Sequence, residues 1–600
     1  ADTKKIWALR KAGLGLLSNL PGDDKAVPVI EDTAVDVQDL PNYIREFNEI
    51  LKKYDLYSVH YAHAGSGEIH LRPIINLKTA EGNRLFRTIA EEIATLVKKY
   101  KGSLSGEHGD GRLRGEFIPQ MVGPRNYELM RTIKKSWDPQ GIFNPGKIVD
   151  TPSMNSMLRY EPGQQTPAFP TLFRFHRQDI LQHAEQCNGS GDCRKTHLSG
   201  GTMCPSFMAT RNEKDTTRAR ANILREFLTH SDKPNRYDHK EIYEVMDLCL
   251  SCKGCKSECP SNVDMAKLKA EFLQHYYDAN GVPFRSRLIA GFAASARLGS
   301  LAPGLYNKLV KGRLTGKWIK KLSGFALDRS MPLLHPTTLR SWHRRHKSSG
   351  TPAKGRVYLF CDEFTNYNDT DIGIKAILLL ERLGYEVVIP EHGESGRAWL
   401  SKGLLRQAKK IAASNVSQLS HLITAETPLI GIEPSAILTF RDEYPDLADD
   451  SWLEAAQKLA ANSFFIDDFL AREIDKGNIR PDQFTRDTRQ IQLHGHCQQK
   501  ALSTVAGSVK LLSLPENYSV KVIPSGCCGM AGSFGYEKEH YDISQKIGEL
   551  VLLPTVRSQP EEVIIAAPGT SCRHQIKDGT GRKALHPVEV LYEALADNNL

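Results

Sequence analysis

One run of cysteines constrains this chain more than any other feature. Cys249, Cys252, Cys255 and Cys259 are separated by two, two and three residues, and Pro260 follows the last of them. Three thiolates at this spacing hold three corners of an iron–sulfur cubane, while the fourth, before proline, turns toward a second cluster. A zinc site is the alternative, but paired zinc cysteines need neither the third cysteine nor the trailing Cys-Pro. The run therefore predicts two clusters and electron transfer.

The partner half of this pattern lies upstream. Cys187 and Cys193 precede Cys204, which is again followed by proline. Cys204 is therefore predicted to complete the cluster of Cys249, Cys252 and Cys255, while Cys187, Cys193 and Cys259 hold the other. A middle cysteine of a full run would stand at Ser190. Two interpretations remain open for this second site, a three-iron cluster or a four-iron cluster with Ser190, another side chain or water as fourth ligand.

Length and cysteine placement narrow the class of protein. At 600 residues the chain predicts three or four domains. No stretch approaches the roughly 18 apolar residues of a spanning helix, and the first residues lack a signal peptide, so a cytoplasmic protein is expected. Of 12 cysteines, seven fall between Cys187 and Cys259. In a chain that is not exported, such clustering indicates metal or cluster ligands rather than disulfides.

Five segments follow from the patterning. Residues 1–150 alternate helical and strand-like runs and predict an α+β domain, and the proline-rich residues 151–170 predict a linker. Residues 171–280 predict a helical iron–sulfur domain and 281–350 a basic helical connector. Residues 351–600 predict a duplicated α/β domain, because three pairs of similar motifs lie about 134 residues apart.

The basic connector carries most of the positive charge. Residues 281–350 contain 14 Lys and Arg against one acid, Asp328, while the whole chain has a net charge of +9. The positive charge that gives the chain its high pI is therefore concentrated in one segment, which does not indicate a nucleic-acid-binding protein. Three interpretations remain: helices packed on the cluster domain with solvated charges, a surface for an acidic protein, and peripheral contact with an anionic inner membrane.

Histidine and glutamate motifs mark the first domain. His63 and His70 flank a glycine-containing turn, and Glu107-His108 lies in a glycine-rich loop, Gly106–Gly111. Two histidines and one glutamate predict a divalent metal site with open positions, usual for zinc and compatible with manganese or iron.

The last segment holds a second group of cysteines. Cys497, the adjacent pair Cys527-Cys528 before Gly529, and Cys572 are strung along the second repeat. They resemble the CCG cysteine-rich domain of heterodisulfide reductases, and four such thiolates can hold an iron–sulfur cluster or zinc. The first repeat has Glu394-Ser395 and Ala436 at the matching places, and Cys361 is expected in the core. One metal centre is therefore predicted here.

Taken together, HAGSGEIH, SGEHGDGRLRGEF and FNPGKIV resemble the C-terminal half of vanillyl-alcohol-oxidase-type flavoenzymes. With the ferredoxin-type run and the CCG motif, the chain resembles the C-terminal portion of bacterial fused FAD/iron–sulfur D-2-hydroxyglutarate dehydrogenases. The resemblance implies the following roles: His63, His70 and Glu107 as metal ligands, His108 as the base, Arg10 and Lys25 as binders of substrate carboxylates, and Asn144 near the flavin.

This family has an FAD-binding domain before the first motif, whereas this sequence begins at the Arg10 motif. The expectation is therefore a C-terminal part, with FAD held mostly by a missing N-terminal portion of the same protein. The implied function is oxidation of D-2-hydroxyglutarate, with electrons leaving through the clusters to a quinone or electron-transfer protein. Alternatives are a D-lactate or glycolate dehydrogenase, a non-catalytic electron-transfer subunit, and a zinc hydrolase, which would leave most of the cysteines without a purpose.

Overall fold

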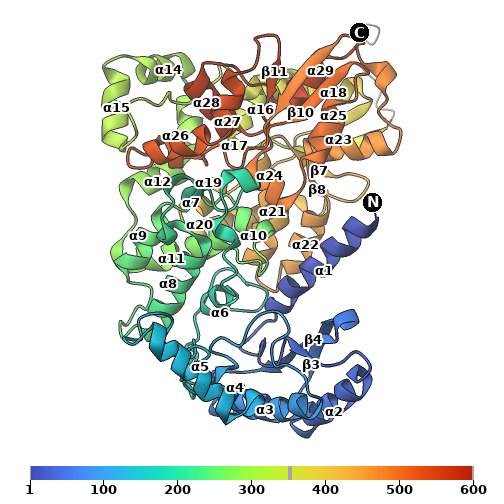
Figure 1. The fold of residues 1–600 in the computed structure, drawn as a ribbon. Helices are drawn as coiled ribbons and strands as arrows, with labels where there is room; N and C mark the ends of the chain where they lie inside the picture. The colour runs from blue at the N-terminus through green and yellow to red at the C-terminus, as the bar shows by residue number, and fades with distance from the viewer. Residues whose placement is uncertain (1, 349–353, 597–600) are drawn as a thin grey trace. The chain divides into compact units, whose positions relative to one another are not determined.

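The computed structural model describes residues 2–348 and 354–596, which divide into two compact units, residues 1–168 and 169–600 (Figure 1). The boundary lies inside the predicted linker. That segment packs on the first unit: the Met154 N–H donates to Glu116 at 2.6 Å, and the Gly163 N–H donates to the Lys78 carbonyl at 2.8 Å. Most of the proline-rich segment is therefore ordered and packs on the first unit.

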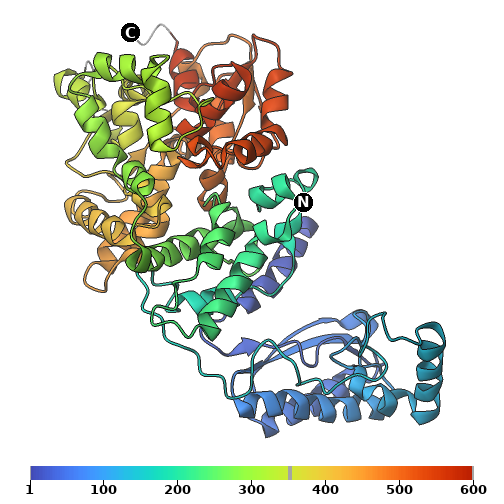
Figure 2. The same ribbon diagram turned by 90° about the vertical axis from the view of Figure 1, so that its left-hand side faces the viewer.

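An antiparallel sheet with helices on one face forms the first unit (Figure 2). β4 is central, pairs with β1 and β2 at its two ends, and pairs with β3 along most of its length. Ile69 and Leu71 of β4 pack with Phe47 of α2 and with Ile89 and Ile93 of α3. Because side chains alternate along a strand, Glu68 and His70 point away from this core. The elements are α1 (Asp2–Ser18), β1 (Lys25–Ala26), β2 (Thr33–Ala34), α2 (Leu40–Lys53), β3 (Ser58–His63), β4 (Glu68–Ile75), α3 (Ala80–Lys99), α4 (Ile118–Val122) and α5 (Pro124–Trp137).

The second unit begins with helices and connecting loops that hold the first seven cysteines, and the helices of the basic connector follow. Its largest hydrophobic core runs from Phe169 to Ala594, so the predicted iron–sulfur and α/β segments share one core. No helix among the described residues is both long and apolar enough to cross a bilayer. The helices are α6 (Ile180–Glu185), α7 (Pro205–Thr210), α8 (Thr217–His230), α9 (Lys240–Asp247), α10 (Gly254–Glu258), α11 (Met265–Asn280), α12 (Phe284–Ala290), α13 (Phe292–Gly299), α14 (Pro303–Lys311), α15 (Thr315–Ser323) and α16 (Leu339–Arg345).

Two parallel sheets complete the second unit. Their strand orders are β6-β5-β7-β8 and β10-β9-β11, so each places its first strand between its second and third. The strands are β5 (Gly355–Phe360), β6 (Tyr385–Val388), β7 (Leu429–Gly431), β8 (Ser463–Phe465), β9 (Arg489–Leu493), β10 (Tyr518–Val522) and β11 (Ile564–Ala566). The helices around them are α17 (Glu363–Tyr367), α18 (Thr370–Arg382), α19 (Arg397–Ser401), α20 (Leu405–Leu419), α21 (Pro434–Leu447), α22 (Leu453–Ala461), α23 (Ile466–Asp475), α24 (Cys497–Leu502), α25 (Ala506–Leu512), α26 (Tyr541–Glu549), α27 (Leu552–Arg557), α28 (Thr570–Thr580) and α29 (Pro587–Glu593).

Candidate functional sites

The β3–β4 hairpin brings the two predicted histidine ligands together. His63 lies opposite Glu68, and Tyr61 lies opposite His70, so all four side chains share one face of the hairpin. The turn depends on Gly67, which has φ +74°; a Cβ there would lie 1.9 Å from the Val35 carbonyl oxygen. The hairpin thus fixes His63, Glu68 and His70, three side chains of types that can ligate a metal, on one rigid surface.

A buried carboxylate holds the loop that brings the fourth. Asp32 is inaccessible to solvent and accepts hydrogen bonds from the N–H groups of Glu107 (2.9 Å) and His108 (3.0 Å) and from the Ser105 hydroxyl. In the resulting arrangement a Glu107 carboxylate oxygen lies 3.5 Å from His63 Nε2 and 3.6 Å from His70 Nε2. The structure therefore brings together His63, His70 and Glu107, the three residues that the sequence predicts as metal ligands.

Glu68 joins this group. Its carboxylate oxygen is 3.2 Å from His70 Nε2, and ligand atoms of His63, Glu68, His70 and Glu107 all lie within 4.8 Å of one another. Burial raises the pKa of Glu68 to about 7, and contacts with Asp32 and the charge of Glu107 add to this effect. Burial would also raise the pKa of Asp32, but hydrogen bonds from Ser105, Glu107 and His108 lower it to about 2. Several carboxylates around two imidazoles form a donor set that fits a divalent cation.

The exposure of the group is uneven. The side chains of His70 and Glu68 are 4% and 8% exposed, whereas those of His63 and Glu107 are 42% and 47% exposed. Among the described residues the buried His70 Nδ1 has no hydrogen-bond partner, and the buried Glu68 Oε1 faces His70 Nε2 at 3.2 Å. A cation here would be held on its buried side by His70 and Glu68 and would stay open to an incoming ligand on its exposed side, as catalytic metal sites are.

His108 and Arg10 lie around the same group. His108 Nε2 is 3.3 Å from a Glu107 oxygen, and its Nδ1 is 3.8 Å from Asp32. The Arg10 guanidinium, on α1, lies over the Tyr61 ring at 5.8 Å, and that ring stacks on His70. The base and one carboxylate binder suggested by the resemblance are therefore close to the predicted metal ligands.

Lys25 and Asn144 are not brought into this group. Lys25 pairs in register with Ile75, five residues along β4 from His70, and its ammonium donates to the Leu20 carbonyl. Five strand residues correspond to roughly 17 Å. Asn144 lies on an exposed loop and has φ +47°.

Glu68 and Asp32 are the residues that sequence reasoning missed. The two-residue step from Glu68 to His70 was a usable signal, because it places both side chains on the same face of a strand. Asp32 had no such signal, since it acts through backbone contacts with a loop more than 70 residues away.

The iron–sulfur cysteines form two groups in the second unit. Cys204, Cys249, Cys252 and Cys255 all line one cavity, although Cys204 is far from the others in sequence. Burial raises the pKa of Cys193 and of Cys259, and the neighbouring Cys187 raises both further. The cavity thus brings Cys204 beside Cys249, Cys252 and Cys255, as the crossed arrangement requires, while the grouping of Cys187, Cys193 and Cys259 stays a prediction. Ser190 is exposed, and both interpretations of the second cluster stay open.

This arrangement makes a spectroscopic prediction. Cys204→Ser is expected to change the same electron paramagnetic resonance signal as Cys252→Ser, whereas Cys259→Ser is expected to change the signal affected by Cys193→Ser. The reason is that each Cys-Pro residue lines the site of the opposite run. Pairing of Cys259 with Cys252 in these spectra would contradict the crossed arrangement.

A third group of thiols lies at one edge of the β9–β11 sheet. Cys497 begins α24, Cys527-Cys528 follow β10, and Cys572 lies in α28; all four are buried. Because the carboxyl ends of parallel strands meet at one edge, three separate loops converge there. His494, which sequence reasoning missed, belongs to this group: its ligand nitrogen lies within 4.8 Å of the sulfurs of Cys528 and Cys572. Its Nδ1 contacts the Ser525 hydroxyl at 2.7 Å, and its buried Nε2 has no hydrogen-bond partner.

The equivalent edge of the β5–β8 sheet has no such group of thiols. Glu363 there accepts hydrogen bonds from the Ser395 N–H at 2.9 Å and from the Ser395 hydroxyl at 2.7 Å. Cys361 is buried and its thiol lies 3.5 Å from the Asn366 side-chain oxygen, in agreement with the expectation of a core residue.

Two of the cysteine sites are neighbours. Cys252 and Cys497 belong to one small apolar cluster with Leu250, Cys527 and Phe534. Burial raises the pKa of Cys252 well above its usual value, and the charge of Cys497 adds to the effect. A redox centre in the Cys204 cavity would therefore stand next to one held by Cys497 and its partners.

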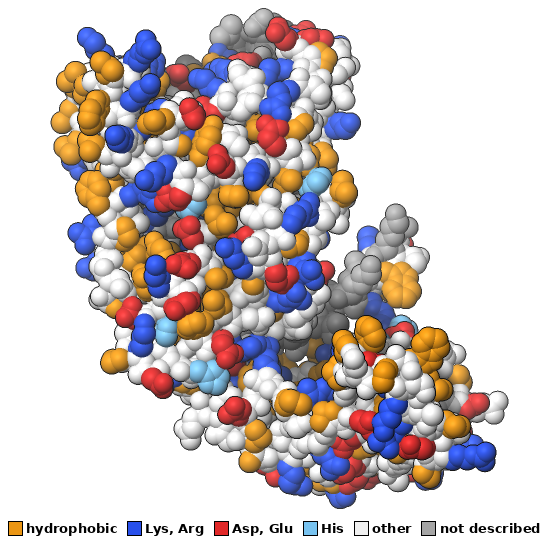
Figure 3. Space-filling model, turned by 60° about the vertical axis from the view of Figure 1, so that its left-hand side comes forward, with side chains coloured by type: hydrophobic (Ala, Val, Ile, Leu, Met, Phe, Trp, Pro, Cys, Tyr) orange, Lys and Arg blue, Asp and Glu red, His pale blue; other side chains and the backbone are white. Residues whose placement is uncertain are grey.

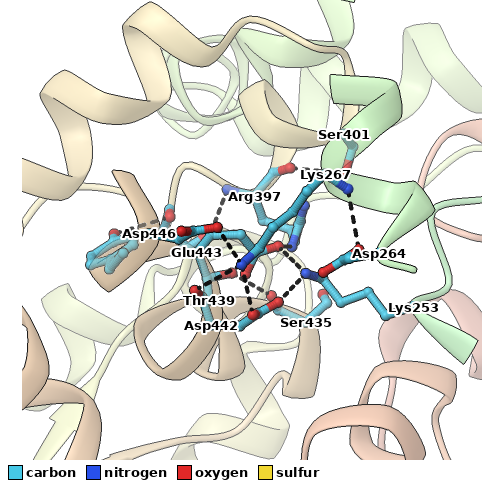
Figure 4. A network of polar contacts seen from close by, with 12 residues as sticks. Lys253, Asp264, Lys267, Arg397, Ser401, Ser435, Thr439, Asp442, Glu443 and Asp446 are labelled. Carbon is cyan, nitrogen blue, oxygen red and sulfur yellow. Dashed lines mark hydrogen bonds and ion pairs between the residues drawn. The ribbon is translucent and has the colours of Figure 1, made fainter. Parts of the chain in front are cut away.

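Two buried basic residues, Lys253 and Arg220, line the Cys204 cavity. Lys253, between two cavity cysteines, contacts Asp442 and, at 2.8 Å, Glu443 of α21 (Figure 4). Lys267 of α11 lies 3.0 Å from Asp442 and 2.8 Å from Asp446. On another side Arg220 of α8, inaccessible to solvent, points to the Cys204 sulfur at 3.6 Å.

Comparison with known proteins bears on these sites. Residues 1–148 match the family described as FAD linked oxidases, C-terminal domain, and residues 186–264 match the 4Fe-4S dicluster domain. The chain resembles bacterial D-2-hydroxyglutarate dehydrogenases. It is 27% identical to the Escherichia coli enzyme, over 99% of this chain and 61% of that protein, and 28% identical to the Pseudomonas putida enzyme, over 98% and 61%.

A shorter match is to the D-lactate dehydrogenase of Archaeoglobus fulgidus, 33% identical over 21% of this chain and 27% of that protein. The chain thus spans 61% of the length of the D-2-hydroxyglutarate dehydrogenases that it resembles. The two domain matches support FAD and iron–sulfur clusters as cofactors, in agreement with the sequence prediction.

Proposed function

We propose that this chain forms the substrate site and the electron exit of an FAD-linked D-2-hydroxyacid dehydrogenase that oxidises D-2-hydroxyglutarate to 2-oxoglutarate. One observation carries the proposal: a Glu107 carboxylate oxygen lies within 3.6 Å of both His63 and His70, with His108 beside it. The choice of substrate comes from relatives named D-2-hydroxyglutarate dehydrogenase, which are similar along nearly the whole chain.

The site residues divide the work between them. His63, His70 and Glu107, with Glu68 behind them, would hold a zinc or manganese ion, which polarises a hydroxyl and a carboxylate oxygen when bound. His108 lies between two carboxylates, with Nε2 3.3 Å from Glu107 and Nδ1 3.8 Å from Asp32, and its imidazole would accept the proton of the substrate hydroxyl. Arg10 supplies a planar guanidinium suited to a carboxylate.

Two cofactors complete the chemistry. FAD, held mostly by an N-terminal portion of the same protein, supplies acceptance of the hydride, and the iron–sulfur clusters supply one-electron transfer. Cys204, Cys249, Cys252 and Cys255 would hold one cluster and Cys187, Cys193 and Cys259 another. The proximity of Cys252 to Cys497 supports a position for the CCG thiols next along this series, before an electron acceptor such as a quinone or an electron-transfer protein.

The two parallel sheets fit a duplicated CCG domain. They share one strand order, and only the second carries the four thiols. A single metal centre, held by Cys497, Cys527, Cys528 and Cys572 with His494 beside them, is therefore our proposal for this domain.

Metal analysis tests the substrate site directly. Glu107→Gln and His70→Ala are each expected to lower bound zinc or manganese by at least about tenfold, because each removes a ligand from a small donor set. Iron in the clusters should not change, and His108→Ala should keep the divalent metal while it abolishes dye-linked oxidation by the flavin-loaded protein. Unchanged metal content in Glu107→Gln would show that the ligand assignment is wrong.

A second candidate function is a D-lactate dehydrogenase. The match to the archaeal D-lactate dehydrogenase and the position of Lys25, five residues from His70 along β4, both favour it, since no lysine is then needed for a distal carboxylate. Rates of dye reduction with D-2-hydroxyglutarate and with D-lactate separate the two functions. A preference for D-lactate would replace our first proposal.

A further inference from the structure

Helices α13–α15 expose large apolar side chains on the second unit. Leu314, Trp318 and Leu322 of the α15 region recur every four residues and are 74%, 63% and 76% exposed. Such spacing places them on one face of a helix. Leu298, Leu301 and Leu305, before and within α14, are 70%, 83% and 61% exposed. We call these six residues and the basic residues among them the α13–α15 surface.

The packing of these helices does not use this apolar face. Only Val310 and Gly316 are buried in α14 and α15, and both are small. The interpretation in which the apolar side of the connector packs on the cluster domain therefore fails for this face. Several large apolar side chains that are exposed together mark an interaction site.

The same surface is strongly positive. Residues 292–323 contain seven Lys and Arg and no acid: Arg297, Lys308, Lys311, Arg313, Lys317, Lys320 and Lys321. Among the described residues none of these seven has a carboxylate within ion-pair distance. Figure 3 shows orange and blue side chains together at the upper left, over the helices that Figure 1 draws in light green.

We propose that the α13–α15 surface binds the interface of an anionic phospholipid bilayer. Lys317 and Lys321 each precede a residue of the apolar stripe, so their ammonium groups can reach phosphates while Trp318 and Leu322 enter the acyl boundary. Trp is suited to such a boundary because its ring is apolar and its N–H is polar.

A bilayer fits this surface better than a second copy of the chain or an acidic protein does. A second copy of the chain, docked through the same surface, would bring two unneutralised positive patches together. An acidic protein would neutralise the lysines, but it gives no reason for a leucine and tryptophan stripe between them. The proposal does not depend on the proposed enzymatic function, because lipid binding is measured without substrate.

Vesicle co-sedimentation tests this proposal with the purified chain. Binding is expected to vesicles that contain phosphatidylglycerol and not to pure phosphatidylcholine vesicles. The double variant Lys317→Gln/Lys321→Gln should weaken binding roughly tenfold or more, since each basic residue near an anionic surface contributes favourably. Trp318→Ser/Leu322→Ser should weaken it also at high salt, where the apolar part remains. The matched control is Lys577→Gln/Lys583→Gln, which removes the same charge from exposed positions elsewhere.

Three results would overturn the proposal: no sedimentation with anionic vesicles at low salt, an equal loss in the control, or full binding by Trp318→Ser/Leu322→Ser. Light scattering adds a further decision. Concentration-dependent dimers that disappear in Trp318→Ser/Leu322→Ser would assign this surface to a second copy. Circular dichroism of each variant should match the original chain, so that loss of binding is not loss of folding.

Discussion

Replacing Asp442 with asparagine is expected to lower the free energy of unfolding of the second unit by about 3–5 kcal/mol, the range for breaking a buried ion pair. The Asp442 side chain is 3% exposed, accepts hydrogen bonds from Lys253 and Lys256, and lies 3.0 Å from Lys267. The neutral amide would leave buried ammonium groups without their shared counterion. Denaturant unfolding followed by circular dichroism measures the change.

The matched control is Asp450→Asn. Asp450 pairs with Arg174 at 2.8 Å, but its side chain is 91% exposed, so its loss should change the free energy of unfolding by about 0–1 kcal/mol. Equal destabilisation by the two variants would contradict the role given to the buried carboxylate.

The same carboxylate sets a pH dependence. Burial would raise the pKa of Asp442, but the charges of Lys253, Lys267 and Lys256 hold it well below its usual value. Its contribution to stability is therefore present above the unfolded-state pKa of about 3.9 and is lost as the pH falls below that value. Asp442→Asn should lose this acid-sensitive part of the stability, while wild type and variant converge at low pH.

Replacing Arg220 with methionine is expected to remove about one iron–sulfur cluster per chain. Arg220 is inaccessible to solvent and donates to the carbonyls of Asp215 and Val245 and to Ser206. Among the described residues it has no carboxylate within ion-pair distance. Burial would lower its pKa, but the neighbouring Cys249 and Cys204 raise it. Since an unpaired buried charge costs several kcal/mol, the cysteine thiolates of a bound cluster would be its counterion, and each would stabilise the other.

Iron analysis and electron paramagnetic resonance measure this effect. Arg220→Met should lose the signal shared by Cys204 and Cys252, and Arg220→Lys should retain part of it. Arg225→Met is the control, because Arg225 lies five residues further along α8 and donates to the Asn222 side-chain oxygen at 3.1 Å. Unchanged iron and an unchanged signal in Arg220→Met would contradict this account.

The features that could be predicted from the sequence are those in which residues stand at a characteristic spacing. Cysteine spacing identified the ligands that the structure gathers around the Cys204 cavity, and a glycine-containing turn between His63 and His70 indicated their hairpin. Asp32, Arg220 and His494 were missed because each acts through contacts with other segments of the chain, where a single residue has no pattern, whereas Glu68 had a usable signal in its two-residue step to His70. The proline-rich segment was predicted as a linker, since composition alone does not show hydrogen bonds such as that from Gly163 to Lys78.

The two halves of the α/β region also differ in what completes them. The edge of the β5–β8 sheet is closed by the hydrogen bonds between Glu363 and Ser395, which need only the chain itself. The edge of the β9–β11 sheet gathers four buried thiols and His494, the donor set of the single metal centre that we propose. Shortage of that metal should therefore leave this edge incomplete, while the β5–β8 edge closes with its own hydrogen bonds. Newly made chains would accumulate with this edge open until the metal is supplied, so cofactor supply would govern how much of this protein reaches its final form.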